Sequence, residues 1–193
     1  AISLAKMISS RVIICPYSRK SGTGRDHARE VLAREFSRLP QEIAIGVRQD
    51  GKPFLCGEDA QIGISHSGTV LAVYIGPSEA GIDIERVKPR VNAAEIAELV
   101  FSEREKGEYA NGDGESLFRF YRSWTAMEAT LKRHGLGLSG LAGRAEYDPA
   151  AIRHWRVGPD YVLCVSAERT VLDAMEIRVL PETAIDPMGV IPC

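Results

Sequence analysis

The chain has 193 residues, 45% of them hydrophobic and 26% charged, which is enough apolar material for one sizeable core or two small lobes. A formal net charge of −2 argues against a protein that binds nucleic acid through bulk positive charge, so we expect no nucleic-acid partner. We also expect no membrane association. No apolar run approaches the roughly 20 residues of a spanning helix, and the first ten residues lack the apolar core of a secretory signal.

The four cysteines are scattered, at Cys15, Cys56, Cys164 and Cys193. They form no CxxC pair and no spacing typical of a disulfide framework or a zinc site. The pattern therefore predicts reduced thiols in a cytoplasmic protein.

In the first part of the chain, Arg11 to Cys15 is predicted to be a strand that ends at Pro16. Apolar residues at helical spacing predict a helix from Arg25 to Leu39. Short β-rich segments then predict an antiparallel meander, with strands at Ile43 to Val47, Phe54 to Cys56, Ile62 to Ser65, Val70 to Ile75 and Ile82 to Glu85.

Helices dominate the next part. Asn92 and Ser102 are each followed three residues later by glutamate, the spacing of a helix start. The longest helix is predicted from Glu115 to Arg133, after a polar turn at 111–114. Strands are then expected at Ile152 to Val157, Tyr161 to Ser166 and Val171 to Val179, followed by a tail without periodicity from Pro181. Helix followed by strands occurs twice, which favours two similar lobes.

Three acids lie in apolar surroundings. Asp83 and Glu85 alternate with apolar residues, so both point to one face of the predicted strand. Glu128 falls on the same helical side as Trp124. A buried carboxylate needs a partner. One alternative is that Glu128 only pairs with Lys132 and that the strand acids face solvent. The other is a site for a hard cation with oxygen ligands, for which Mg²⁺ with a phosphate substrate is the expected occupant.

Other candidate residues are polar groups with ordinary alternatives. His66 lies between Ser65 and Ser67 before a glycine, where several donors suit a phosphate oxygen, although a lone histidine is more often structural. Lys52 lies beside a rigid turn, and a solvent-exposed surface lysine is its simplest interpretation. A basic cluster at a helix start is formed by Arg19, Lys20, Arg25 and Arg29, with a solvated face as its alternative. Glu105 fits a capping box with Ser102.

These segments, in this order, resemble the 4′-phosphopantetheinyl transferases of the larger, surfactin-synthetase-activating type. The landmarks span about residues 51 to 140: Gly51-Lys52-Pro53, Ser65-His66-Ser67-Gly68, Gly81-Ile82-Asp83-Ile84-Glu85, Phe101-Ser102-Glu103-Arg104-Glu105 and Trp124-x-x-x-Glu128-Ala129-x-x-Lys132. The resemblance implies an α+β fold that is a pseudo-dimer of two similar lobes, each a small, mainly antiparallel sheet packed on a long helix. The expected division is residues 1–86 and 87–193, with the active site between the lobes of a monomer.

The resemblance also implies an activity. A serine of an apo acyl or peptidyl carrier protein attacks the β-phosphate of coenzyme A with Mg²⁺ bound, and 3′,5′-ADP is released. By their match to the family's motifs, Asp83, Glu85 and Glu128 are expected to hold the metal and Lys132 to contact phosphate. Ser65 and His66 match contacts to the 3′-phosphate end of coenzyme A, which Arg25 is expected to join. Lys52 lies where adenine is contacted, and Glu105 matches an acid proposed to help deprotonate the serine.

One departure from the family pattern is Met127, where the family usually has lysine before the glutamate. Losing a charged hydrogen bond from the transition state costs about 1.5–3 kcal/mol, or roughly tenfold to a hundredfold in rate. This favours a second hypothesis, a non-catalytic relative that binds coenzyme A or a carrier. A third is another Mg²⁺-dependent phosphotransferase.

Overall fold

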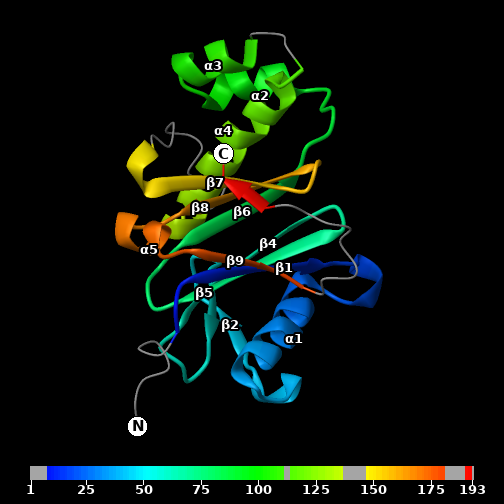
Figure 1. Cartoon of the computed structure of the whole chain (residues 1–193), viewed down its shortest axis with the longest axis vertical. Helices are drawn as coiled ribbons and strands as arrows, with labels where there is room; N and C mark the ends of the chain where they lie inside the picture. The colour runs from blue at the N-terminus through cyan, green and yellow to red at the C-terminus, as the bar shows by residue number, and fades with distance from the viewer. Residues whose placement is uncertain (1–7, 111–113, 137–146, 181–189, 193) are drawn as a thin grey trace.

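The structure is a computed structural model that describes residues 8–110, 114–136, 147–180 and 190–192. The predicted α+β class is confirmed: two sheets lie against each other, and each is covered on its outer face by a helix (Figure 1). Within the described ranges, no helix combines the length and hydropathy that a membrane crossing requires.

The first sheet has the strand order β4-β5-β1-β9, with β4 at Gln61–Ser67, β5 at Val70–Gly76, β1 at Arg11–Pro16 and β9 at Glu176–Val179. The second has the order β10-β7-β8-β6, with β10 at Val190–Pro192, β7 at Ile152–Val157, β8 at Tyr161–Ser166 and β6 at Gly81–Arg86. All neighbouring pairs are antiparallel except β1 with β9.

The helices are α1 (Gly24–Phe36), α2 (Ala93–Val100), α3 (Glu103–Ala110), α4 (Ser116–His134) and α5 (Arg169–Asp173). Helix α1 ends earlier than the predicted Leu39, because Ser37 adopts a left-handed φ of 52° that stops the helix. Strands β2 (Ile45–Val47) and β3 (Pro53–Leu55) form a separate hairpin, so the predicted meander is divided between a hairpin and two sheets.

The layers follow from the two-residue period of the strands. In β1, Val12 and Ile14 join the core between the two sheets, whereas Ile13 and Cys15 join the core beneath α1. On the far side, Ala126 and other small residues of α4 pack closely on β8. The order of layers is therefore α1, first sheet, second sheet, α4 (Figure 1).

Two strands cross between the halves of the chain. Strand β6 joins the second sheet by pairing with β8, with Asp83 opposite Cys164, and β9 joins the first sheet beside β1. Each sheet therefore contains one hairpin from its own half, β4–β5 or β7–β8, and one strand from elsewhere. The lobe boundary after residue 86 stays a prediction, because these exchanged strands tie the two halves together.

The single strand predicted from Val171 to Val179 is wrong. The segment starts as α5 and turns before β9. Val171 and Leu172 are both buried, and Arg153 donates to the carbonyl of Leu172 and to the carboxylate of Asp173, which fixes the end of the helix. β-Branched residues predicted a strand here, but packing and this ion pair favour one helical turn. The predicted tail without periodicity contains β10, which pairs with β7.

The start of β6 lies against α4 because residue 81 is glycine. A Cβ at Gly81 would overlap the carbonyl oxygen of Ala129 and come within 2.5 Å of the amide nitrogen of Arg133. Only a glycine permits this approach without moving backbone. The close packing brings the acids of β6 next to the acid of α4.

Candidate active site

The three acids predicted from sequence come from two adjoining elements. Asp83 and Glu85 lie two residues apart on β6, and Glu128 lies on α4, which packs on β6. Asp83 is 3% exposed, while Glu85 and Glu128 are half-buried. Burial raises the pKa of the Glu128 carboxyl, and the charges of Asp83 and Glu85 add to the rise. The three carboxylates therefore act on one another.

Two serines of β4 hold the acids of β6 in place. The Ser65 hydroxyl donates to Asp83 Oδ1 at 2.8 Å and accepts from the Ile84 amide at 3.2 Å. Ser67 repeats the pattern two residues later, donating to Glu85 Oε2 at 2.6 Å and accepting from the amide of residue 86 at 3.1 Å. Because β4 and β6 belong to different sheets, these hydroxyls join the two sheets at the acids.

Lys132 is the cation of this cluster. Its Nζ lies 2.6 Å from Asp83 Oδ1 and 3.2 Å from Ser65 Oγ. The sequence offered an ion pair between Glu128 and Lys132 as one alternative, but in the structure Lys132 pairs with Asp83. The lysine charge still opposes the rise in the pKa of Glu128. The other Asp83 oxygen, Oδ2, is buried and has no hydrogen-bond partner in the described part of the chain.

Among the described residues, no three side chains of the usual metal-binding types are gathered tightly enough to form a ready-made metal site. The donor set nevertheless fits a hard divalent cation. It is made of carboxylate oxygens, it includes the unpartnered buried oxygen of Asp83, and burial raises the pKa of Glu85, as it does that of Glu128. A bound cation would give the Asp83 oxygen a partner and would favour the ionised forms of Glu85 and Glu128. A phosphate of the substrate would complete its coordination.

His66 lies at the edge of this cluster. Its ring stacks on Tyr17, with centroids 4.6 Å apart, and a Cβ at Gly24 would come 2.8 Å from the ring, so the start of α1 lies directly beside it. Burial lowers the pKa of His66, and the positive charges of Arg19 and Lys132 lower it further. His66, Arg19 and the start of α1 therefore form a small, positively polarised corner next to Lys132.

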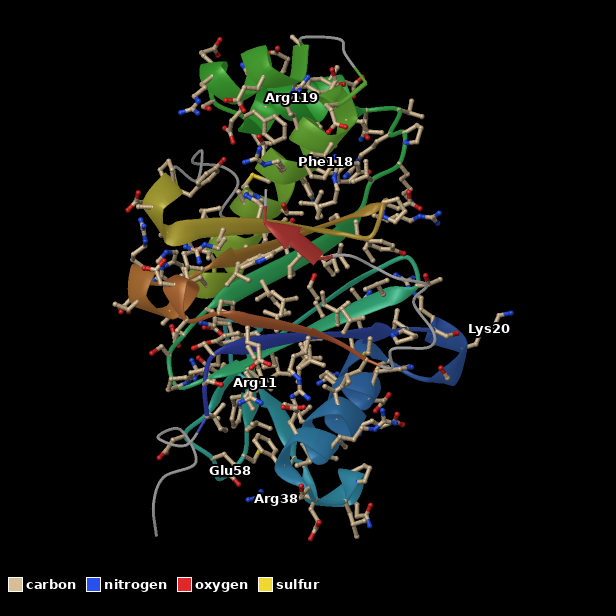
Figure 2. All side chains as sticks on the ribbon, in the orientation of Figure 1. Arg11, Lys20, Arg38, Glu58, Phe118 and Arg119 are labelled. Carbon is tan, nitrogen blue, oxygen red and sulfur yellow. The ribbon has the colours of Figure 1, made fainter. Side chains whose placement is uncertain are left out.

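The rest of the predicted basic cluster is less focused. Arg25 is exposed on the first turn of α1. That turn carries its own cap, since Thr23 and Asp26 form a complete capping box. Lys20 projects outward from the turn before α1 (Figure 2). Arg19 is thus the member whose charge reaches His66.

Lys52 is already engaged. Its Nζ donates to the carbonyl oxygen of Arg133 at 2.8 Å and lies 3.2 Å from Glu79 Oε2, and its side chain is only 12% exposed. The lysine therefore ties the turn after β2 to the end of α4. A contact with adenine stays a prediction and would require Lys52 to leave these partners.

Glu105 lies apart from the other acids. The capping box with Ser102 is confirmed by hydrogen bonds in both directions, and the Tyr147 hydroxyl donates to the other carboxylate oxygen. Burial, the largest influence, raises the pKa of Glu105, but hydrogen bonds from Ser102, Tyr147 and Ser123 together lower it. Its partners thus come from the residue before α3, from α4 and from the segment before β7.

Met127 lies on the side of α4 that faces Glu105 of α3. Both line a cavity of about 650 Å³ between α3, α4 and β7, together with Tyr147, Ser123 and His154. The described lining includes none of the three clustered acids or Lys132. Met127 therefore points toward Glu105. No pattern in the sequence indicated that Tyr147, twenty residues further along the chain, would lie in the same cavity.

Comparison with known proteins gives a consistent family assignment. A family profile described as the 4′-phosphopantetheinyl transferase superfamily matches residues 79–171, which include all four acids and Lys132. The chain is 33% identical over 173 residues to a 4′-phosphopantetheinyl transferase of Bacillus subtilis, covering 80% of this chain and 76% of the relative.

Two further relatives carry similar names. The chain is 30% identical over 157 residues to 4′-phosphopantetheinyl transferase Sfp of Bacillus subtilis strain 168, covering 72% of this chain and 69% of the relative. It is 28% identical over 151 residues to a putative 4′-phosphopantetheinyl transferase of Synechocystis, covering 70% of this chain but only 61% of that protein's length.

Proposed function

The chain belongs to the 4′-phosphopantetheinyl transferase superfamily, and on that premise we propose that it transfers the 4′-phosphopantetheine arm of coenzyme A to a serine of an apo acyl or peptidyl carrier protein. The reaction would depend on Mg²⁺ and release 3′,5′-ADP. The observation that carries the proposal is the placement of Asp83, Glu85 and Glu128 around one lysine, with a buried carboxylate oxygen left unpartnered.

Asp83, Glu85 and Glu128 are the residues that would hold the metal. When bound, Mg²⁺ would neutralise charge on the pyrophosphate oxygens and orient them for in-line attack. The carboxylates are suited to this because Ser65 and Ser67 fix the strand acids before any ligand arrives. Such prior positioning lowers the reorganisation that the transition state requires.

The cations of the site would bind the rest of coenzyme A. We assign Lys132, which lies among the acids, to the β-phosphate, and His66 with Arg19 to the 3′-phosphate, to which they would offer donors and positive charge. Ser65 supports Asp83 as well as lying beside His66, so its contact with ligand would be shared. Arg25 and Lys52 are secondary candidates, because one is exposed and the other is engaged with α4.

In the proposed reaction, the carrier serine oxygen bonds to the β-phosphorus while the bond from that phosphorus to the bridging oxygen breaks. The bridging oxygen keeps the electron pair and leaves with 3′,5′-ADP. We assign the serine proton to Glu128 and not to Glu105, because Glu128 belongs to the acid cluster, whereas both carboxylate oxygens of Glu105 already accept hydrogen bonds from Ser102 and Tyr147. Glu105 is better suited to organise α3 and the neighbouring cavity.

The second hypothesis, a non-catalytic relative, was motivated by Met127. Since Met127 lines the cavity beside Glu105, its lack of charge removes a possible partner of Glu105 and not a group of the acid cluster. That geometry favours the active enzyme. A different Mg²⁺-dependent phosphotransferase has no specific feature in its favour. We further propose that the chain acts as a monomer in the cytoplasm. In the described part of the chain Cys15, Cys56 and Cys164 form no disulfide, which is compatible with a reducing compartment.

The test is intact-mass analysis of apo-carrier proteins incubated with this chain, coenzyme A and Mg²⁺. We expect a mass gain of one phosphopantetheine arm on the carrier, its loss when the acceptor serine is replaced by alanine, and its loss in excess chelator. If no carrier in a panel of acyl and peptidyl carriers gains this mass, the proposed activity is contradicted.

A further inference from the structure

Lys132 and Asp83 form the closest charge contact of the acid cluster, with 2.6 Å between Nζ and Oδ1. The lysine follows Glu128 by four residues, so the same side of α4 carries both groups to β6. Its charge also lowers the pKa of Glu85 and of Glu128 against the effect of burial. A single ammonium group therefore serves three carboxylates.

The two partners differ in their freedom to move. Asp83 is buried and anchored through Oδ1 by the Ser65 hydroxyl. Lys132 has a side chain that is 38% exposed at the end of a flexible four-carbon stem. Any exchange of partners at this point would move the lysine and leave the aspartate where it is.

We propose that Lys132 is a displaceable internal counter-ion, which a divalent cation must remove from Asp83 before it can bind there. This inference rests on the metal site of the proposed function. An ammonium group in contact with Asp83 and a divalent ion on the same carboxylate repel each other strongly at such distances. The displaced ammonium group then lies near His66, on which its charge already acts, and can meet the phosphates of coenzyme A. Lys132 thus opposes the metal in the absence of coenzyme A and supports the substrate in its presence.

Two consequences distinguish this exchange from ordinary electrostatics. Removing the Lys132 charge tightens metal binding to the ligand-free protein, whereas removing a nearby cation that does not contact Asp83 has a smaller effect. Arg90 is the matched control, because its charge also acts on Glu85 but its side chain donates to Asn92 and covers the ring of Trp124. The advantage of the Lys132 variant should also shrink when coenzyme A is bound.

The experiment titrates Mn²⁺, followed by loss of the free-ion electron paramagnetic resonance signal, into the wild-type chain, Lys132→Met, Lys132→Arg and Arg90→Gln. We expect Lys132→Met to bind Mn²⁺ about tenfold more tightly than wild type, Lys132→Arg to stay close to wild type, and Arg90→Gln to gain less than about threefold. With saturating coenzyme A, the difference between wild type and Lys132→Met should fall below about threefold. Circular dichroism confirms that each variant is folded. If Lys132→Met does not fold, Lys132→Gln replaces it, because glutamine also removes the charge, and the same gain of about tenfold is expected.

Equal gains in Lys132→Met and Arg90→Gln, or no gain in Lys132→Met, would overturn the displacement while leaving the metal site intact. A difference that persists unchanged with coenzyme A would also overturn it, because the lysine would then not have left Asp83. Absence of Mn²⁺ binding in all four proteins would overturn the metal site and the proposed function with it.

Discussion

The Ser65 hydroxyl donates to Asp83 Oδ1 at 2.8 Å, so a side chain of the first sheet holds an acid of the second. The same hydroxyl accepts from the amide of Ile84, which fixes the β6 backbone as well. Ser67 and Glu85 repeat the relationship two residues later. The first sheet contributes none of the three acids, yet it determines where two of them point.

Replacing Ser65 by alanine should destabilise the protein by about 1–3 kcal/mol, because Asp83 and the Ile84 amide lose a buried partner. Urea unfolding measures the change. Ser67→Ala is the matched control and should cost less, since Ser67 and Glu85 are only half-buried. A Ser65→Ala protein within about 0.5 kcal/mol of wild type would show that the hydroxyl does not hold the strand.

Replacing Glu128 by glutamine should stabilise the metal-free protein. Burial and the charges of Asp83 and Glu85 oppose ionisation of Glu128, and a neutral amide of the same shape removes that conflict. We expect the thermal midpoint of the metal-free protein to rise by about 2–4 °C and the stabilisation by Mn²⁺ to be lost. A midpoint that falls in metal-free buffer would mean that Glu128 has a structural partner.

Met127→Lys tests which side of α4 position 127 serves. A lysine there enters the cavity that contains Glu105 and can pair with that carboxylate. We expect kcat/KM for carrier modification to stay within about threefold of wild type, with stability equal or higher. A gain of about tenfold or more would instead mean that the new ammonium group reaches the phosphates of coenzyme A.

We expect His154 to make the stability of the folded protein sensitive to acid. It is buried, and desolvation with the Arg122 charge lowers its pKa to about 4 from an unfolded value of 6.5. The unfolded chain therefore binds more protons between these values, and stability that is present above pH 6.5 is lost as the pH falls toward 4. The expected loss from this residue is about 3 kcal/mol.

Urea unfolding from pH 7 to pH 4 should show a shallower decline for His154→Gln than for wild type. The exposed His134 provides the control, since His134→Gln should keep the wild-type slope. Identical slopes in all three proteins would show that His154 is protonated without cost in the folded state.

Short-range sequence patterns correctly predicted features that depend only on residues close together in the chain. Alternation placed Asp83 and Glu85 on one strand face, and cap-plus-three spacing identified the Ser102 box. The same local reasoning failed for the strand expected at Val171 to Val179, where a turn of helix is held by Arg153 from another strand. It could not pair Tyr147 with Glu105, because that contact depends on how α3 and β7 pack against α4.

The partner of Lys132 shows the same limit. Helical spacing offered Glu128, one turn away, whereas packing of β6 on α4 offers Asp83 at 2.6 Å. The strand exchange that places β6 in the second sheet has no signature in any one segment. Resemblance to a family supplied the two-lobed fold, which periodicity alone had only suggested.

Single-turnover transfer to an apo-carrier protein, followed by intact mass, tests the central claim that Asp83, Glu85 and Glu128 carry the chemistry. We expect Asp83→Asn and Glu128→Gln to lower the rate by about a thousandfold or more while both proteins remain folded, and Glu105→Gln to stay within about tenfold of wild type. A full transfer rate in either Asp83→Asn or Glu128→Gln would contradict the assignment of the acid cluster as the active site.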